Sequence, residues 1–227
     1  MKIKILRQES PVSESYWETF IADVPGDMSV AGLLDHLNYN DDIVNEKGEK
    51  TTRIGWECSC LQGMCGACAM VINGTPALAC QTFIRDLGEN EITIQPLRKF
   101  PVLHDLIVDR SVIQDNLRQT NIFIEEYKPQ KTKRGAQKEH HHQYSAAKCL
   151  KCGLCLEVCP NYTNGLSFYG AVFANDCYIV SARNREKSDE IRKLYGQHFA
   201  SSCSKALSCM DVCPMQTQTL ASIAKLQ

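Results

Sequence analysis

The first hundred residues alternate between short apolar runs and polar turns, a pattern that predicts strands with one helix. Residues 29–37 (SVAGLLDHL) form the one helical segment, with Ser29 at the N-cap position before an apolar face. Asn73-Gly74 lies between apolar residues and predicts a two-residue hairpin turn. Strands are predicted at 3–6 (IKIL), 17–24 (WETFIADV) and 92–97 (ITIQPL). Together these elements predict a small mixed sheet with one helix packed on it.

After Pro101 the pattern becomes helical. Leucines and isoleucines recur there at helix-like intervals, at positions 103, 106, 107, 113 and 117. From Cys149 onward the pattern is again mostly helical, with a charged amphipathic segment at 184–194. The predicted domains are therefore 1–104 and 105–227. Between them, 128–138 carries five basic residues with Pro129 and Gly135, which indicates a solvated connector, and His140 to His142 are predicted to continue it as a polar linker.

Composition limits the class of protein. The 227 residues are long enough for two small domains, and a net charge of -1 argues against a nucleic-acid-binding protein. The first residues, MKIKILRQ, have the character of neither a secretory signal nor a transit peptide, so a reducing, prokaryotic cytoplasm is expected. The longest uncharged stretch, 58–84, contains Gln62, Asn73 and Pro76 besides five cysteines and three glycines, so it would strand polar groups in hydrocarbon and is rejected as a membrane span.

The 13 cysteines change this picture most. An odd number, grouped at intervals of two and three residues, suits metal ligation better than disulfides. The first group has the C-x4-C-x2-C spacing of plant-type 2Fe-2S ferredoxins, and a fourth cysteine follows after a hairpin. Its members are Cys60, Cys65, Cys68 and Cys80. The alternatives are a zinc knuckle or buried structural cysteines, but zinc ligands usually come as two close doublets. Cys58 has no place in the pattern and is predicted to be a small buried side chain.

A second group reproduces the two-cluster ferredoxin run C-x2-C-x2-C-x3-C-P, in which the fourth cysteine ligates the other cluster. By this exchange, a 4Fe-4S cluster is predicted at Cys149, Cys152, Cys155 and Cys213. The other cluster is left with three thiols, those of Cys159, Cys203 and Cys209, because Ala206 stands where a fourth cysteine belongs. A 3Fe-4S cluster, with a raised reduction potential, is therefore expected. The alternative is a 4Fe-4S cluster with an exogenous ligand. Cys177 belongs to neither run and is predicted to be a buried free thiol.

With these motifs in this order, the chain resembles the iron-sulfur subunit of the succinate dehydrogenase and fumarate reductase family. The resemblance rests on SCLQGMCGACAMVINGTPALAC, CLKCGLCLEVCP and CSKALSCMDVCP and covers nearly the whole chain. It implies an α+β protein with an N-terminal plant-ferredoxin-like (β-grasp) 2Fe-2S domain. An all-α bacterial-ferredoxin-like domain with the 4Fe-4S and 3Fe-4S clusters would follow.

The resemblance also implies partners. In this family electrons pass between the FAD of a separate flavoprotein subunit, which carries the dicarboxylate catalytic residues, and a quinone beside the 3Fe-4S cluster. A membrane anchor, which in some members bears haem, completes a complex at the cytoplasmic face of the plasma membrane. No catalytic residue is therefore expected on this chain.

Three positions depart from the pattern of the succinate:ubiquinone members. Asn161 to Asn164 lack their tryptophan, Ser204 replaces a histidine, and Leu61 replaces an arginine. The first two departures favour a menaquinone-linked enzyme that works as a fumarate reductase. Leu61 indicates that the surface near the first cluster meets a divergent flavoprotein, which leaves substrates other than fumarate open. The alternatives are a flavoprotein reductase, soluble or acting on another substrate, that is not linked to quinone, and a non-redox zinc or structural cluster protein.

Overall fold

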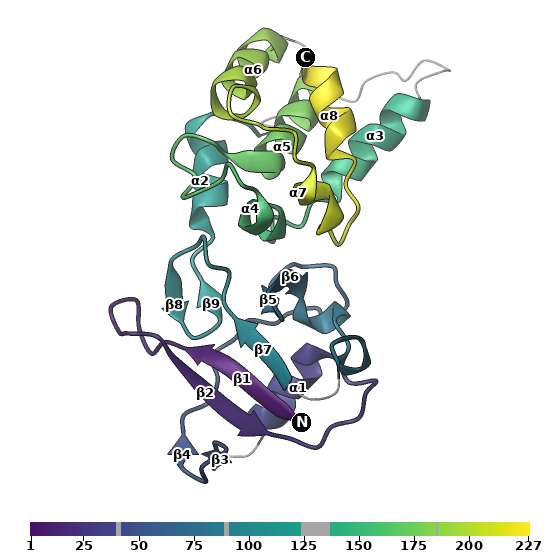
Figure 1. The fold of residues 1–227 in the computed structure, drawn as a ribbon. Helices are drawn as coiled ribbons and strands as arrows, with labels where there is room; N and C mark the ends of the chain where they lie inside the picture. Colours follow the sequence, from purple (N-terminus) through teal and green to yellow (C-terminus); the bar gives the residue numbers. More distant parts are fainter. Residues whose placement is uncertain (40–41, 89–90, 124–136, 185) are drawn as a thin grey trace. The chain divides into compact units, whose positions relative to one another are not determined.

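The computed structural model describes all residues except 40–41, 89–90, 124–136 and 185 (Figure 1). The chain divides into two compact units, Met1–Asp109 and Arg110–Gln227. The first unit extends beyond the predicted boundary at residue 104, because Val102–His104 pairs with Ile107–Val108.

The first unit is built on a five-stranded sheet of order β2-β1-β7-β5-β6. Strands β1 and β7 are parallel, and the other neighbours are antiparallel. Helix α1 (Val30–Asn38) lies beside this sheet (Figure 1). The strands of the sheet are β1 (Lys2–Arg7), β2 (Tyr16–Ile21), β5 (Ala69–Ile72), β6 (Thr75–Leu78) and β7 (Glu91–Gln95). The remaining elements are the pairs β3 (Ile43–Val44) with β4 (Lys50–Thr51) and β8 (Val102–His104) with β9 (Ile107–Val108), and the 3₁₀ turns η1 (Ala79–Gln81) and η2 (Ile84–Asp86).

The predicted elements of this unit are confirmed where the apolar pattern is regular. Alternate residues of β1 and β7 are buried, with Ile3, Ile5, Ile92 and Ile94 at 0% exposure. Each such burial contributes about 1.5–3 kcal/mol relative to leaving the side chain in water. Helix α1 begins as expected, because Ser29 Oγ accepts a 3.1 Å hydrogen bond from the N–H of Gly32.

The predicted hairpin at Asn73-Gly74 is also confirmed. Both residues have left-handed backbone conformations, with φ of 46° and 78°, as the tightest hairpin turns require. The turn joins β5 to β6 and sends the chain back toward the segment that precedes β5.

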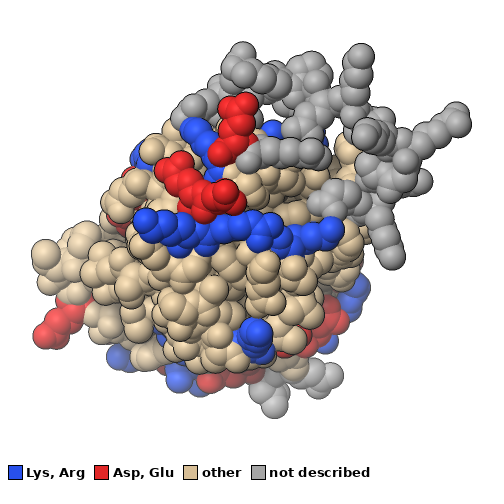
Figure 2. Space-filling view, turned by 90° about the horizontal axis from the view of Figure 1, so that it is seen from above, with Lys and Arg blue, Asp and Glu red and all other residues tan. Residues whose placement is uncertain are grey.

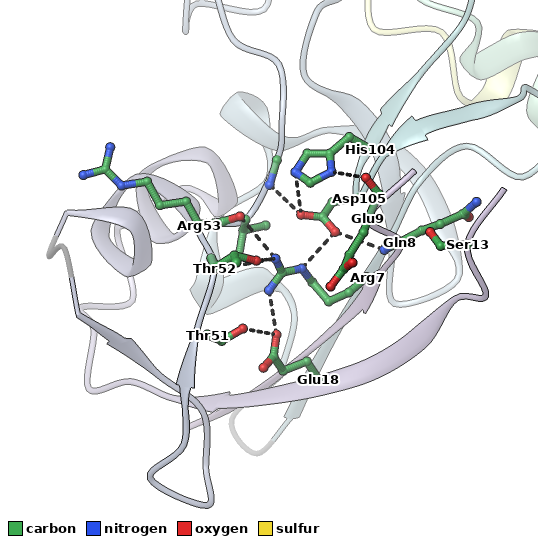
Figure 3. Close-up of polar contacts among 12 residues, drawn as sticks. Arg7, Gln8, Glu9, Ser13, Glu18, Thr51, Thr52, Arg53, His104 and Asp105 are labelled. Atoms are coloured by element: carbon green, nitrogen blue, oxygen red, sulfur yellow. Dashed lines mark hydrogen bonds and ion pairs between the residues drawn. The ribbon is translucent and has the colours of Figure 1, made fainter. Parts of the chain in front are cut away.

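The helical interpretation of residues 103–107 was wrong, because this segment is the β8–β9 hairpin and the helix begins only at Ser111. A buried ion network explains the turn, since Asp105, with φ of 49°, places its carboxylate beside Arg7 (Figure 3). Arg7 and Asp105 are fully buried, and Nε of Arg7 lies 3.0 Å from Oδ1 of Asp105. Nη1 of Arg7 also donates to Glu18 at 2.6 Å, and Asp105 Oδ2 accepts from the N–H of Gly55 at 2.8 Å.

The elements described in the second unit are helices arranged around α5 (Gly170–Arg183), most of whose residues are buried. The others are α2 (Ser111–Gln119), α3 (Gln137–Ala147), α4 (Leu154–Val158), α6 (Ser188–Tyr195), a π turn η3 (Gly196–Ala200), α7 (Ser208–Asp211) and α8 (Thr219–Leu226). Helices α2, α3, α4, α6 and α8 all contact α5. The cysteine runs lie at the short helices α4 and α7, which contact each other.

Two predictions concern polar segments near the start of this unit, the linker at His140 to His142 and the basic connector at 128–138. His140 to His142 do not form a linker; they lie on α3, and Nδ1 of His142 is 2.7 Å from Oε1 of Gln218. Most of the predicted basic connector at 128–138 lies outside the described residues. On the face drawn in Figure 2, basic and acidic side chains lie close together among uncharged residues, in keeping with the near-neutral net charge. Within the described ranges, no helix is both long and apolar enough to span a membrane.

Candidate iron-sulfur cluster sites

The first site is a loop that leads into β5 and is closed by the β5–β6 hairpin. Cys60, Cys65 and Cys68 lie before β5, and Cys80 lies in η1 directly after β6. Ala69 of β5 pairs with Leu78 of β6. Directly beside this pair, the N–H of Ala79 donates a 3.0 Å hydrogen bond to the Cys68 carbonyl. The hairpin therefore returns Cys80 to the loop, and the N–H of Gly63 donates to Cys80 Sγ at 3.3 Å.

Backbone N–H groups of this loop point at sulfur atoms. The N–H groups of Gln62 and Met64 both donate to Cys60 Sγ at 3.3 Å, and that of Ala67 donates to Cys65 Sγ at 3.5 Å. The donors of Gln62 and Met64 lower the pKa of Cys60 to about 7, because they stabilise its thiolate. The loop reaches this shape through left-handed conformations at Leu61, Gly63 and Gly66. Four thiols with N–H donors around them suit an anionic cluster.

The second site is a small cavity in the second unit that is partly open to solvent. Its thiols come from both cysteine runs: Cys149, Cys152, Cys155, Cys209 and Cys213. Burial raises the pKa of Cys152 to about 11 and raises that of Cys155 well above its usual value. Neighbouring thiols raise it further, since the Cys155 thiolate would meet those of Cys152 and Cys149. Iron ligation needs thiolates, so binding would release these protons.

The third site is a neighbouring small cavity lined by Cys159, Cys203 and Cys209. Ala206 lines the same cavity, and its methyl group cannot bind metal. Lys205 and Leu207, on either side of Ala206, both have left-handed backbone conformations, with φ of 58° and 61°. Burial, followed by the nearby thiols of Cys159 and Cys203, raises the pKa of Cys209 to about 11.

The structure thus brings the predicted site residues together in three groups. Cys209 lines both cavities of the second unit, so these two groups are adjacent. In the part of the chain that the structure describes, no three His, Cys, Asp or Glu side chains are arranged to hold a single metal ion. The donor sets fit clusters, because each cavity combines several thiols with apolar walls such as Leu154 and Val172, or Phe168 and Ile223.

The two remaining cysteines, Cys58 and Cys177, differ in their exposure to solvent. Cys177 is buried on α5, as predicted. The prediction for Cys58 was wrong, because its side chain is exposed. Cys58 precedes the loop, at a position in neither a strand nor a helix.

Sequence reasoning missed the polar residues around the second site. Lys151 stands between two cysteines of the run and pairs with Asp176 of α5. Arg110 Nη1 donates to the Cys152 carbonyl at 3.3 Å, and Thr217 contacts Cys213. The basic residue between Cys149 and Cys152 was visible in the sequence, whereas its partner on α5 was not, since the two are far apart along the chain.

The fold and the three groups of thiols define an iron-sulfur protein. Residues 2–115 match the family model of a 2Fe-2S iron-sulfur cluster binding domain, and residues 145–217 match that of a 4Fe-4S dicluster domain. The chain is 34% identical to the succinate dehydrogenase iron-sulfur subunit of Bacillus subtilis, with 98% of this chain and 89% of that protein covered. It is 30% identical to the fumarate reductase iron-sulfur subunit of Haemophilus influenzae, with coverage of 98% and 90%.

A solved structure has the same fold. A chain of the apo Sdh1 complex of Mycobacterium smegmatis superposes with a TM-score of 0.76 at 22% identity, covering 99% of this chain and 94% of its own length. The chain belongs to the family of succinate dehydrogenase and fumarate reductase iron-sulfur subunits.

Proposed function

We propose that this chain is the electron-transfer subunit of a succinate dehydrogenase or fumarate reductase complex. The observation that carries the proposal is the series of three groups of thiols, one in the first unit and two adjacent ones in the second, in a chain of this family. Iron-sulfur clusters supply reversible one-electron transfer when bound. The chain would hold them in its own cysteines.

The ligand assignment follows the groups. Cys60, Cys65, Cys68 and Cys80 would hold 2Fe-2S, and the N–H groups around the loop would stabilise their charge. Cys149, Cys152, Cys155 and Cys213 would hold 4Fe-4S, and Cys159, Cys203 and Cys209 would hold 3Fe-4S. The methyl group of Ala206 in the third cavity supports three irons there rather than four. We assign Met1–Asp109 to the plant-ferredoxin-like domain, since β9 belongs to the first unit, and Arg110–Gln227 to the bacterial-ferredoxin-like domain, whose described elements are helices.

The partners follow from the family. An FAD-containing flavoprotein subunit would exchange electrons with the dicarboxylate, and a membrane anchor, with or without haem, would hold the complex at the cytoplasmic face of the membrane as a peripheral subunit. The quinone would lie near Ser204, where the family's ubiquinone-linked members have histidine, and menaquinone is the proposed acceptor or donor. Exposed Leu61 and Met64, at 53% and 60%, give the first cluster loop an apolar surface that suits a protein partner.

Anaerobic preparation of the complex tests this function. We expect about nine iron atoms per chain, three distinct EPR-active centres, and fumarate reduction by a menaquinol analogue. Cys213→Ser should remove the 4Fe-4S signal, whereas Cys177→Ala, its matched control at a buried thiol outside the groups, should leave all three. An iron content of about four atoms per chain would contradict the proposal. Failure to oxidise menaquinol with active flavoprotein present would contradict the link to quinone.

A further inference from the structure

A line of buried hydroxyl groups connects helix α5 to the thiol of Cys213. Thr217 Oγ1 lies 3.3 Å from Cys213 Sγ, and the Thr217 N–H donates to the same sulfur at 3.4 Å. Oγ1 of Thr217 lies 3.4 Å from Oγ1 of Thr219, which in turn accepts a 3.1 Å hydrogen bond from Nδ2 of Asn175. Asn175, Thr217 and Thr219 are 2%, 4% and 2% exposed, so water does not compete for these contacts.

The two ends fix the direction of this hydrogen-bond chain. At one end the amide nitrogen of Asn175 donates to the Thr219 hydroxyl, whose own proton is then available to Thr217. At the other end a thiolate can only accept, so the Thr217 hydroxyl donates to Cys213 Sγ. Every donor therefore points toward the sulfur. Hydrogen bonds aligned in one direction polarise one another, which strengthens the last of them.

The location of this hydrogen-bond chain determines which cluster it can affect. Thr217 and Thr219 line the same cavity as Cys149, Cys152, Cys155 and Cys213, and so does Asn175. Hydrogen bonds to ligand sulfurs favour the more negative, reduced form of a cluster and so raise its reduction potential. The hydrogen-bond chain begins at Asn175, which is a buried residue of α5, the central helix of the unit.

We propose that Asn175, Thr219 and Thr217 are positioning residues that raise the reduction potential of the cluster held by Cys149, Cys152, Cys155 and Cys213. The inference rests on the proposed ligand set. Through these residues the protein would make that cluster a better electron acceptor without a change of ligand. Thr217 acts on the sulfur directly, and Thr219 and Asn175 act through it.

Redox titration of the anaerobic holoprotein, followed by the EPR signal of this cluster, tests the inference. Thr217→Val keeps the shape of the side chain and removes the hydroxyl. It should reduce the ratio of reduced to oxidised cluster at a fixed potential by about three- to tenfold, where tenfold corresponds to 59 mV for a one-electron couple. Thr217→Ser retains the hydroxyl and should restore the potential of the unmodified protein. Thr219→Val should shift it in the same direction by less.

The matched control is Thr120→Val. Thr120 is also a buried threonine of the second unit, but its hydroxyl donates to the Asn116 carbonyl at 2.6 Å at the end of α2. This variant should lose stability and keep the potential. An unchanged potential in Thr217→Val would overturn the inference, and an unchanged potential in Thr219→Val would overturn the roles of Thr219 and Asn175.

Iron, sulfide and EPR analysis of the unmodified protein separates this inference from the proposed function. If all three centres form but the Thr217→Val variant leaves the reduction potential unchanged, only the role of the hydroxyl groups is refuted. Absence of a cluster at Cys213 would refute the ligand set itself.

Discussion

Lys151 and Asp176 form an ion pair beside the second cluster site. Their side chains are 26% and 14% exposed, and the lysine projects from a left-handed backbone conformation between Cys149 and Cys152. Burial raises the pKa of Cys149, whereas the ammonium and the backbone N–H of Lys151 counteract that rise. The carboxylate of Asp176 thus holds a positive charge close to a thiol that we assign to the 4Fe-4S cluster.

Replacement of Lys151 by Met should lower the reduction potential of this cluster. The ammonium favours the additional negative charge of the reduced form, and its loss leaves the Asp176 carboxylate without its partner. We expect a shift of about 59 mV or less, a tenfold change or less in the one-electron equilibrium. Redox titration by EPR measures it. Lys193→Met, which removes an exposed lysine on α6, is the matched control and should leave the potential unchanged.

Replacement of Ala206 by Cys should convert the 3Fe-4S cluster into 4Fe-4S. The new thiol would enter the cavity lined by Cys159, Cys203 and Cys209 and could bind a fourth iron there. We expect the potential of this centre to fall and quinone reduction to slow. EPR of the oxidised protein checks the conversion, and Ala224→Cys, at an exposed position on α8, serves as the control. An unaltered EPR spectrum of the oxidised centre in the Ala206 variant would refute the assignment of its ligands.

Replacement of Asp105 by Asn should destabilise the first unit by about 3 kcal/mol, since it leaves the buried guanidinium of Arg7 with only part of its charge compensation. The amide also loses one acceptor for the N–H groups of Gln8 and Gly55. The midpoint of urea unfolding measures the effect. Asp42→Asn breaks the exposed pair with Lys50 and should cost about 1 kcal/mol or less. Equal effects of the two variants would argue against a structural role of the buried network.

Alkylation should distinguish the two cysteines outside the clusters. Thiolates are the reactive form, and burial raises the pKa of Cys177 far above its usual value, while the Cys58 side chain is exposed. In the native holoprotein we expect iodoacetamide to modify Cys58 and to leave Cys177 unmodified until urea unfolds the second unit. Peptide mass spectrometry detects both products, and Cys58→Ser should abolish the rapid reaction. Labelling of Cys177 before unfolding would contradict its buried position.

Regular patterns in the sequence predicted regular structure well. The alternation of Ile3 and Ile5, the cap at Ser29 and the turn at Asn73-Gly74 each express a local preference, and the structure contains all three. The segment 103–107 was mistaken for helix because Leu103, Leu106 and Ile107 have helix-like spacing that continues into the true helix α2. Its true conformation depends on Asp105 reaching Arg7, a contact between residues far apart in sequence.

The candidate site could be read from cysteine spacing, but its surroundings could not. The spacing placed Cys149 and Cys213 in one group, and both line one cavity of the structure. Which polar residues meet them depends on how α5 packs, so Asp176 and Thr217 had no signal in the sequence. The exposure of Cys58 was likewise hidden, since a cysteine in a loop carries no pattern that tells whether another segment covers it.

Both cavities of the second unit combine thiols from its two cysteine runs, which has a consequence for biosynthesis. A nascent chain that ends before Cys203 presents three of the four thiols assigned to the 4Fe-4S cluster and one of the three assigned to the 3Fe-4S cluster. The four cysteines assigned to the 2Fe-2S cluster emerge from the ribosome close together. The first loop can thus be loaded with iron early. With the proposed ligand sets, the other two centres would be completed only after the segment up to Cys213 has been translated.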